Sequence, residues 1–255
     1  MICHRNYFQI FLICLLALIQ TCVVSTEIQS RIVGGKATTI NRVPYLVHLL
    51  DNGRFFCGGT IVNQQYIVTA AHCVKGVAAR RLTVVAGTGK LSERGVRSQV
   101  VKVMVPKGFN MDSMTMDVAV LKLKTPLKGR FIQPIGLCSK GWKPGTSFKV
   151  SGWGLTGENA SSTPNQVRTV NVRSMAKPKC TGRFRGNARL TKTMFCAAIA
   201  GRKDACLGDS GGPAVINGEL CGIVSWGIGC ARRAFPGVYT NVNRVKSFIQ
   251  KAMKR

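Results

Sequence analysis

Residues Asp204 to Pro213 have the sequence Asp-Ala-Cys-Leu-Gly-Asp-Ser-Gly-Gly-Pro, which places Ser210 between an acid and two glycines. Glycine lets a backbone turn tightly and brings amide N–H groups close to a ligand. Two such groups, from Gly208 and Ser210, predict an oxyanion hole beside a serine nucleophile. A run of Gly, Asp and Ser is also typical of an ordinary turn, so the rest of the chain has to decide between the two interpretations.

The composition of the 255-residue chain allows one large β-rich unit or two small domains. Hydrophobic residues make up 45% of it, which is enough for a substantial core, and 37 basic against 9 acidic residues give a net charge of +28. A surface this cationic attracts sulfated glycans, anionic membranes, nucleic acids or acidic proteins. The basic residues are scattered and no nucleic-acid module is present, so we expect loose polyanion adhesion and no specific nucleic-acid binding.

The first 25 residues have the features of a secretory signal peptide. Arg5 precedes an uninterrupted apolar run from Ile10 to Ile19, and Val23 and Ser25 supply a small-residue cleavage site. The run is shorter than the roughly 20 residues that a bilayer span needs, although a retained anchor is the alternative. We therefore expect no membrane span and a secreted, extracellular protein, in which disulfides are permitted.

The junction between residues 26–31 and Ile32-Val-Gly-Gly35 predicts an activation cleavage after Arg31. Cutting there would create an ammonium group at Ile32, for which Asp209 beside the nucleophile is a suitable partner. Insertion of the new terminus would order the oxyanion amides, as expected of a zymogen switch. The alternative is an ordinary basic residue in a flexible segment.

Beyond residue 40, short apolar or alternating runs separated by Gly, Pro and Asn predict many short strands, as in β barrels or sandwiches. The predicted strands are 43–50, 66–71, 82–86, 99–105, 118–123, 148–152, 166–172, 213–216, 220–225 and 237–242. Residues 243–254 instead carry apolar side chains at helical spacing, with Asn243 as the N-cap and basic residues at the C-terminal end. We expect this helix to pack on the body; a membrane-active role is the alternative.

Three residues in the order His, Asp, Ser form a candidate set for nucleophilic catalysis. His72 follows an apolar run in Thr69-Ala-Ala-His-Cys73, and Asp117 precedes the apolar run that begins at Val118. Each has an ordinary alternative, as a half-buried imidazole or as a turn acid. Their joint occurrence favours Ser210 as the nucleophile, His72 as its general base and Asp117 as the group that orients the imidazole.

The chain resembles chymotrypsin-family serine peptidases, especially invertebrate trypsins, over the whole region from Ile32 to the C-terminus. Six motifs carry the resemblance: Ile32-Val-Gly-Gly, Thr69-Ala-Ala-His-Cys, Asp117-Val-Ala-Val-Leu, Ser151-Gly-Trp-Gly, Gly208-Asp-Ser-Gly-Gly-Pro and Ser225-Trp-Gly…Gly237-Val-Tyr. The resemblance implies an all-β peptidase domain at 32–255. It would contain two packed six-stranded antiparallel barrels, approximately 46–135 and 136–242, with the active site in the crevice between them and a helix at the C-terminal end. His72 and Asp117 would come from the first barrel and Ser210 from the second.

The resemblance also places Asp204 at the base of the primary specificity pocket, where a carboxylate favours Arg or Lys in the substrate. A solvated loop acid is the alternative. Gly227 and Gly237 match the glycines of the pocket wall, and Ser225 belongs to the same pocket. Ala205 occupies a position where many trypsins have Ser. Because a hydroxyl partner for a Lys ammonium is lost there, we expect Arg to be preferred over Lys.

Eight cysteines follow the signal region, and the resemblance implies the pairs Cys57–Cys73, Cys180–Cys196 and Cys206–Cys230. A further pair, common in vertebrate members, is replaced by Phe148 and Ile216. The even number of cysteines in an oxidising compartment suggests a bond between Cys138 and Cys221. Cys22 would be the alternative partner of Cys138 if the signal peptide were cut before it.

The region that corresponds to the family's calcium loop lacks the expected ligands. Between Gly87 and Val100 there is one acid, Glu93, whereas calcium sites use several oxygen ligands. We therefore expect no calcium requirement, no other metal and no cofactor. Asn159-Ala-Ser161 is an N-glycosylation sequon in a polar loop, which makes Asn159 a candidate glycosylation site.

Together these features predict a secreted trypsin-like serine endopeptidase, made as a zymogen, that hydrolyses bonds after Arg and Lys through an acyl-enzyme. Its partners would be protein or peptide substrates, an activating protease, protein inhibitors and sulfated glycans. Of the 37 basic residues, 35 remain once Arg5 and Arg31 are set aside, and they offer an unrestricted Arg/Lys protease many sites for self-cleavage. This favours limited proteolysis in a cascade. The alternatives are a broad digestive trypsin, a non-catalytic cationic binding protein on the same fold, and a polyanion-binding or membrane-disrupting protein.

Overall fold

The computed structural model describes residues 34–199, 201 and 203–255. The predicted signal peptide, the activation segment and the cleavage junction at Arg31 and Ile32 lie outside the described residues. The described part of the chain forms strands β1 to β14 and helices α2 to α4, with two short 3₁₀ turns. The protein is therefore mostly β, as the sequence predicts.

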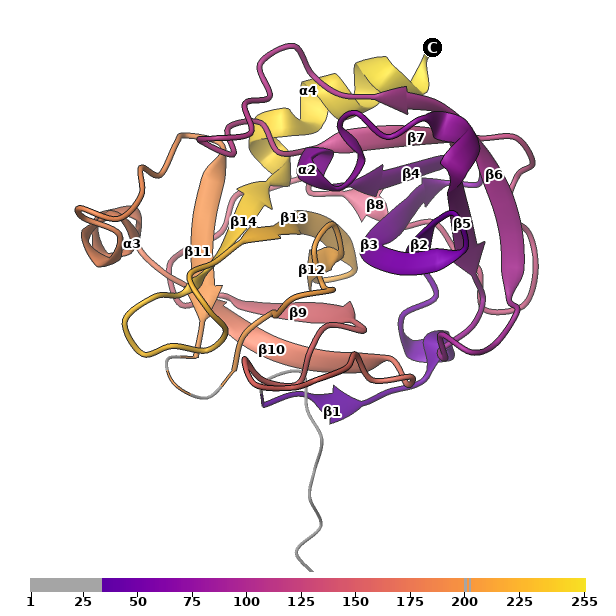
Figure 1. Cartoon of the computed structure of the whole chain (residues 1–255). Coiled ribbons are helices and arrows are strands. Elements are labelled where there is room, and N and C mark those ends of the chain that lie inside the picture. The colour runs from indigo at the N-terminus through magenta and orange to yellow at the C-terminus, as the bar shows by residue number, and fades with distance from the viewer. Residues whose placement is uncertain (1–33, 200, 202) are drawn as a thin grey trace, which may run out of the picture. The chain divides into compact units, whose positions relative to one another are not determined.

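Six antiparallel strands close the first barrel in the order β2-β3-β4-β7-β6-β5 (Figure 1). Their bounds are β2 Leu46–Asp51, β3 Arg54–Asn63, β4 Tyr66–Thr69, β5 Leu82–Ala86, β6 Val96–Met104 and β7 Ala119–Leu123. Strands β2 and β5 pair directly, which joins the two ends of the series and leaves no free edge. Fully buried apolar side chains from four strands contribute to the core of this barrel: Leu46, Ile61, Ile67 and Leu121.

A second ring of six antiparallel strands runs in the order β9-β10-β11-β14-β13-β12 and closes where β12 pairs with β9. The bounds are β9 Ser147–Gly152, β10 Arg168–Ser174, β11 Met194–Ala198, β12 Pro213–Ile216, β13 Glu219–Trp226 and β14 Gly237–Asn241. Two short strands extend this sheet: β1 (Lys36–Ala37) pairs antiparallel with β10, and β8 (Gly136–Leu137) pairs parallel with β13. The predicted fold of two six-stranded barrels is confirmed.

Helix α4 (Val242–Met253) follows the second barrel, and its buried face includes Val245 and Ile249. The prediction that Asn243 caps this helix is wrong, because the N-cap position is Asn241, and Asn241 makes no side-chain capping bond. The Asn243 amide instead donates to the carbonyl oxygen of Lys140 at 2.9 Å, which ties the first turn of the helix to the preceding loop. None of the helices among the described residues combines the length and the apolar character needed to cross a bilayer.

Strands β1, β3, β8 and β11 are absent from the strands that the sequence predicts, and the short helices α2 (Ala71–Val74) and α3 (Lys177–Arg183) are not predicted either. Strand β3 contains Gly58 and Gly59, a pair more typical of a turn. In the structure a Cβ at Gly58 would lie 3.1 Å from the Cα of Gly212. Gly58 therefore lets the second barrel approach the β3 backbone, whereas a Cβ at Gly59 would collide with Ile67 and Val47 inside the first barrel, and the pair does not mark a chain reversal.

Several hydrogen bonds connect the barrels beside the site that the sequence predicts, among them the following three. The Gly58 N–H donates to the Ser210 carbonyl at 2.8 Å, and the Thr240 hydroxyl donates to the Asp117 carbonyl at 2.8 Å. The Trp153 indole N–H donates to the carbonyl oxygen of Gly89 at 3.0 Å. The loops that carry the candidate catalytic residues are thus fixed to one another across the barrel boundary.

Candidate active site

His72 and Asp117 lie together because β4 and β7 are neighbours in the first barrel, with Thr69 opposite Ala119. Helix α2 begins directly after β4 and places His72 above the barrel end. The His72 Nδ1 atom lies 2.8 Å from Asp117 Oδ2, and the His72 main-chain N–H donates to Asp117 Oδ1 at 2.9 Å. Since Nδ1 faces the carboxylate, Nε2 is the ring nitrogen that can accept a proton from a nucleophile.

Asp117 is fully buried, so its carboxylate depends on hydrogen bonds from the protein. One of these comes from the Ser225 hydroxyl, which donates to Asp117 Oδ2. Ser225 lines the cleft, as the sequence analysis expects of a pocket residue, but its hydroxyl is directed at the carboxylate. Ser225 therefore helps to hold the acid that orients His72.

The other described histidine, His48, has no comparable position. Its ring is 1% exposed and packs at 5.1 Å between ring centroids against Trp153. Burial, with a smaller effect from the charge of Arg97, lowers the pKa of His48 to about 4. His48 is therefore a neutral core residue, and His72 is the histidine that can act as a base in the cleft.

Ser210 occupies a tight turn between Cys206 and β12. The Asp209 N–H donates to the Cys206 carbonyl at 3.0 Å, and the Gly212 N–H donates to the Asp209 carbonyl at 2.9 Å. Gly211 has φ +77°, and a Cβ there would lie 2.6 Å from the Gly58 carbonyl oxygen, so this position requires glycine.

His72 and Ser210 both line a cleft of about 600 Å³. In the turn beside it, the N–H groups of Asp209, Gly211 and Gly212 donate to main-chain carbonyls. The N–H groups of Gly208 and Ser210 have no acceptor within the described part of the chain. Two unpaired donors next to a serine hydroxyl are what a developing oxyanion needs.

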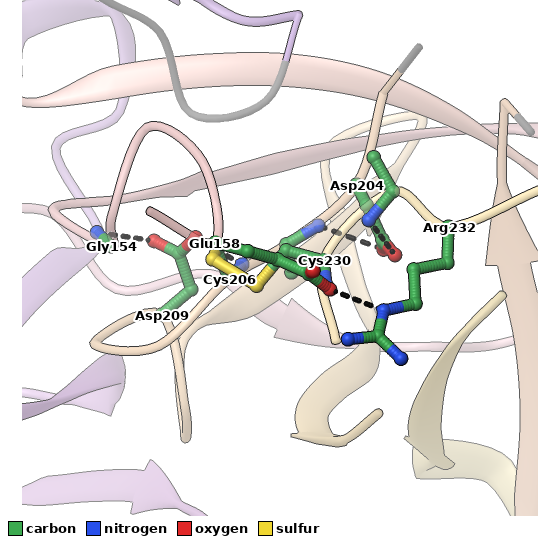
Figure 2. The surroundings of a disulfide bond; sticks show 9 residues. Gly154, Glu158, Asp204, Cys206, Asp209, Cys230 and Arg232 are labelled. Carbon is green, nitrogen blue, oxygen red and sulfur yellow. Dashed lines mark hydrogen bonds and ion pairs between the residues drawn. A yellow bond between two sulfur atoms is a disulfide. The ribbon is translucent and has the colours of Figure 1, made fainter. Parts of the chain in front are cut away.

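Asp209 is fully buried and is not among the residues that line the cleft; Figure 2 shows its carboxylate directed at Gly154. Its oxygens accept the Gly154 N–H at 2.8 Å and the Cys206 N–H at 3.0 Å. A Cβ at Gly152 or Gly154 would overlap this carboxylate, which explains the two glycines that flank Trp153. Burial raises the pKa of Asp209 to about 6, although the two N–H bonds oppose the shift.

Asp204 lines the same cleft and is 1% exposed. It accepts the Ala205 N–H at 2.9 Å and the Ala231 N–H at 3.1 Å. Burial raises the pKa of Asp204 to about 7; hydrogen bonds from the backbone oppose this shift, and the nearby charge of Asp209 adds to it. A Cβ at Gly237 would overlap the Asp204 carboxylate. Ala205, Gly227 and Gly237 line the cleft with Asp204, so the structure brings the predicted pocket residues together.

An ion pair that the sequence did not indicate closes one rim of this cleft. Glu158 Oε1 accepts the Arg232 Nε–H at 2.7 Å and the Cys230 main-chain N–H at 2.6 Å (Figure 2). A Cβ at Gly229, which has φ +71°, would overlap the Glu158 carboxylate. Both charged side chains line the cleft. No local sequence pattern signals this contact, because the two residues are 74 positions apart.

Four disulfides join the cysteines of the described residues: Cys57–Cys73, Cys138–Cys221, Cys180–Cys196 and Cys206–Cys230. The first fixes the strand β3 to the helix that carries His72. The last joins the loop of the candidate nucleophile to the Gly229–Ala231 segment of the pocket wall (Figure 2). Closing a loop with 24 residues of separation stabilises a fold by about 3 kcal/mol in a chain-entropy estimate.

Two groups of potential metal ligands occur among the described residues, and each contains a disulfide. One consists of Cys57, Cys73 and His72, and the other of Cys138, Cys221 and Glu219. Sulfur in a disulfide is not the thiolate that binds transition metals. Glu93 pairs with Lys90 Nζ at 3.4 Å and bonds the Thr88 hydroxyl, so this acid is already engaged.

Comparison with known proteins is consistent with this geometry. A family model described as Trypsin matches residues 32–249. Seminase from Drosophila melanogaster is 42% identical over 228 residues, which cover 89% of this chain and 83% of that protein. Trypsin beta from Drosophila erecta and Trypsin delta from Drosophila melanogaster are each 41% identical over 225 residues, covering 88% of this chain and 88% of each relative.

Proposed function

This chain belongs to the trypsin family and is a serine endopeptidase, and from that premise we propose that it is a secreted zymogen whose active form cleaves after Arg in preference to Lys. The observation that carries the proposal is the buried carboxylate of Asp204 at the base of the cleft that His72 and Ser210 also line. A negative charge at the end of a narrow cleft selects a long cationic side chain, because the charge-assisted hydrogen bonds form only with that class of residue.

In the proposed mechanism, His72 Nε2 removes the proton of the Ser210 hydroxyl as its oxygen attacks the scissile carbonyl. Asp117 holds the imidazole in the required tautomer and stabilises the imidazolium that forms, and the N–H groups of Gly208 and Ser210 bind the oxyanion. The imidazolium then protonates the leaving amine. Water, deprotonated by His72, hydrolyses the acyl-enzyme and regenerates Ser210.

Activation follows from a cut after Arg31 by a peptidase that accepts Arg. The released ammonium of Ile32 would pair with Asp209, whose burial makes an unpaired charge costly. That cost supports the proposed switch, because the ammonium and the carboxylate would neutralise each other next to the oxyanion amides. The apolar run from Ile10 to Ile19 supports secretion.

The test uses a matched pair of fluorogenic peptides that differ only in Arg or Lys at the cleaved position. The secreted chain is cut after Arg31, its Ile32 terminus is verified, and it is compared with the Ser210→Ala and Arg31→Gln variants. We expect Arg-selective hydrolysis that both variants lose. Equal cleavage of the two peptides would refute the Arg preference, and inactivity of a correctly cut chain would refute the mechanism in favour of a binding protein.

We further propose a limited-proteolysis role with protein inhibitors as regulators. The 35 basic residues after Arg31 would make a permissive Arg/Lys peptidase destroy itself. Narrow specificity predicts that the active chain stays intact on storage and leaves most Arg and Lys bonds of casein uncut. Rapid autolysis with extensive casein degradation would instead indicate a digestive trypsin.

A second proposal concerns sulfated glycans, because one groove is lined by three cationic side chains and by no acidic one. Lys177, Arg185 and Arg189 are exposed and line an open groove of about 630 Å³ beside α3. Residues 159–203 contain no acidic residue, and none of the four ion pairs in the described region involves them. Guanidinium groups bind sulfate oxygens in pairs.

The groove offers little to the other polyanions. Within the described residues, the exposed large hydrophobic side chains are Val96, Val101, Met111 and Leu207, and none lines the groove. It therefore lacks the aromatic surface that stacks nucleic-acid bases and the apolar wedge that enters a bilayer. Heparin fragments should bind more weakly to a Lys177→Gln, Arg185→Gln, Arg189→Gln variant than to a Lys102→Gln, Lys124→Gln, Lys128→Gln control of equal charge. An equal loss in both would show diffuse attraction without a site.

A further inference from the structure

Asn159 occupies a turn at the mouth of the cleft. The Ala160 N–H donates to the Gly157 carbonyl at 3.1 Å, which closes the turn, and Asn159 is exposed and lines the cleft together with His72 and Ser210. Its side chain makes no hydrogen bond within the described residues. The asparagine amide is thus directed to solvent beside the catalytic apparatus.

The neighbouring residue holds this turn in place. Glu158 accepts the Cys230 N–H at 2.6 Å and the Arg232 Nε–H at 2.7 Å, so the turn is bound to the pocket wall (Figure 2). The far end of the same loop lies near the oxyanion turn, since a Cβ at Gly208 would be 3.3 Å from Thr163 Cγ2. A group attached to Asn159 therefore stays at the rim of the cleft.

Asn159 also begins the only Asn-X-Ser/Thr sequence in the chain, with Ala160 and Ser161 at the next two positions. Ser161 is exposed, so both polar side chains of the sequon can reach a transferase. A glycan at this position is bulky and solvated. An extended peptide needs only a narrow path to Ser210, whereas a folded protein must dock a broad surface against the rim.

We propose that Asn159 carries an N-linked glycan that acts as a steric gate at the rim of the cleft, admitting short extended peptides and slowing the docking of folded substrates and protein inhibitors. The attachment takes an oligosaccharide from a lipid-diphosphate donor of the secretory pathway. The Asn159 nitrogen bonds to the anomeric carbon, the bond from that carbon to the diphosphate oxygen breaks, the lipid diphosphate leaves, and one amide proton passes to solvent. The inference rests on the proposed function, because it requires secretion and a peptidase cleft.

The test compares three full-length chains secreted from eukaryotic cells and cut after Arg31. Ser161→Ala removes the sequon while keeping Asn159 and Glu158, and Ser161→Thr preserves the sequon as the matched control. Intact mass reports the glycan. The kcat/KM for a short Arg peptide measures whether the catalytic site itself is intact. Surface plasmon resonance measures the association rate of pancreatic trypsin inhibitor.

We expect the wild type and Ser161→Thr to carry one glycan that Ser161→Ala lacks. Peptide kcat/KM should be the same in all three chains, whereas the inhibitor should associate about tenfold faster with Ser161→Ala, within the range that changes at one interface produce. An unglycosylated wild type, or equal association rates with the glycan present, would overturn the gate. A rise in peptide hydrolysis that parallels faster association would also overturn it, by showing a change in the site itself. Absence of peptide hydrolysis in every chain would refute the proposed function. The intact mass and the association rate of the inhibitor would still show whether a glycan at Asn159 slows the docking of a folded protein.

Discussion

The substitution Ala205→Ser should convert the proposed Arg preference into acceptance of both basic residues. Ala205 lies directly beside the acid of the pocket, and its N–H donates to Asp204 Oδ1 at 2.9 Å. The Asp204 carboxylate also accepts the Ala231 N–H at 3.1 Å. A carboxylate has about four acceptor positions, so two backbone N–H groups use part of its capacity before any substrate arrives.

These filled positions disfavour Lys more than Arg. An Arg guanidinium is long enough to reach the carboxylate and planar enough to use its remaining capacity, whereas a shorter Lys ammonium needs further acceptors for its three N–H donors. A hydrogen bond between a hydroxyl and a charged group contributes about 1.5–3 kcal/mol, and each 1.36 kcal/mol changes kcat/KM about tenfold. Because water can partly replace the missing hydroxyl, we expect the ratio of Arg to Lys kcat/KM to fall about tenfold in Ala205→Ser.

The assay measures kcat/KM for the matched Arg and Lys peptides with the wild type, Ala205→Ser and Ala205→Gly. Ala205→Gly has no hydroxyl and should keep the wild-type ratio. If Ala205→Ser leaves the ratio unchanged, or if the Gly variant shifts it equally, the hydroxyl does not govern the choice between the two cations and the reasoning is refuted.

Four further predictions concern the acids of the cleft and the disulfide with the longest sequence separation. Burial raises the pKa of Asp204 to about 7 in the empty pocket, so the affinity of the wild type for the aryl amidine benzamidine should weaken as the pH falls through about 7. The Asp204→Asn variant should bind benzamidine weakly at every pH. A wild-type affinity that does not change with pH would contradict this prediction. Because this acid has a higher pKa in the folded than in the unfolded chain, its contribution to stability should decline as the pH rises from its ordinary value of 3.8 toward 7, a decline that urea unfolding of Asp204→Asn should lack. Glu158→Gln keeps an acceptor for the Cys230 N–H but loses the charge that pairs with Arg232. Steady-state kinetics should therefore give a raised KM for Arg peptides with kcat unchanged. An unchanged KM would show that the ion pair does not affect peptide binding at the rim of the cleft. The double substitution Cys138→Ser, Cys221→Ser removes a buried disulfide that spans 83 residues, so the free energy of unfolding should fall by about 2–4 kcal/mol. The kcat/KM for short peptides should be retained. An unchanged midpoint of urea unfolding would count against a stabilising role of this disulfide.

The sequence predicts the strands whose apolar runs are bounded by clear turn residues. The predicted strands 82–86 and 213–216 coincide with β5 and β12, because each is a short apolar segment without internal glycine. Strand β3 is not predicted because a Gly58-Gly59 pair is typical of a turn, although Gly58 permits the close approach of Gly212 and Gly59 leaves room for Ile67 and Val47. Local propensity does not report which backbone from the other barrel will lie against a strand.

The residues of the candidate site likewise differ in whether the local sequence reveals them. His72, Asp117, Asp204 and Ser210 can be found from sequence because each lies in a short motif whose residue types suggest their chemistry. The Glu158–Arg232 pair cannot, because neither residue lies in such a motif and their contact depends on how two loops cross. Ser225 falls between these cases: its position in the cleft follows from the resemblance, whereas its bond to Asp117 depends on the packing of β13 against the first barrel.

The acids of the chain are concentrated around the cleft, whereas the molecule as a whole is strongly cationic. Eight of the nine acidic residues follow Arg31, and four of these form or adjoin the site: Asp117, Glu158, Asp204 and Asp209. Surface cations act over a screening length of about 8 Å at physiological ionic strength, whereas buried carboxylates are screened much less. A cationic peptide is therefore repelled by the surface at a distance and attracted only once its side chain enters the cleft. Under the proposed Arg specificity, an acidic protein that presents an accessible Arg is attracted at both stages. The charge distribution thus supports a basic cleavage residue within an acidic substrate over a uniformly basic one.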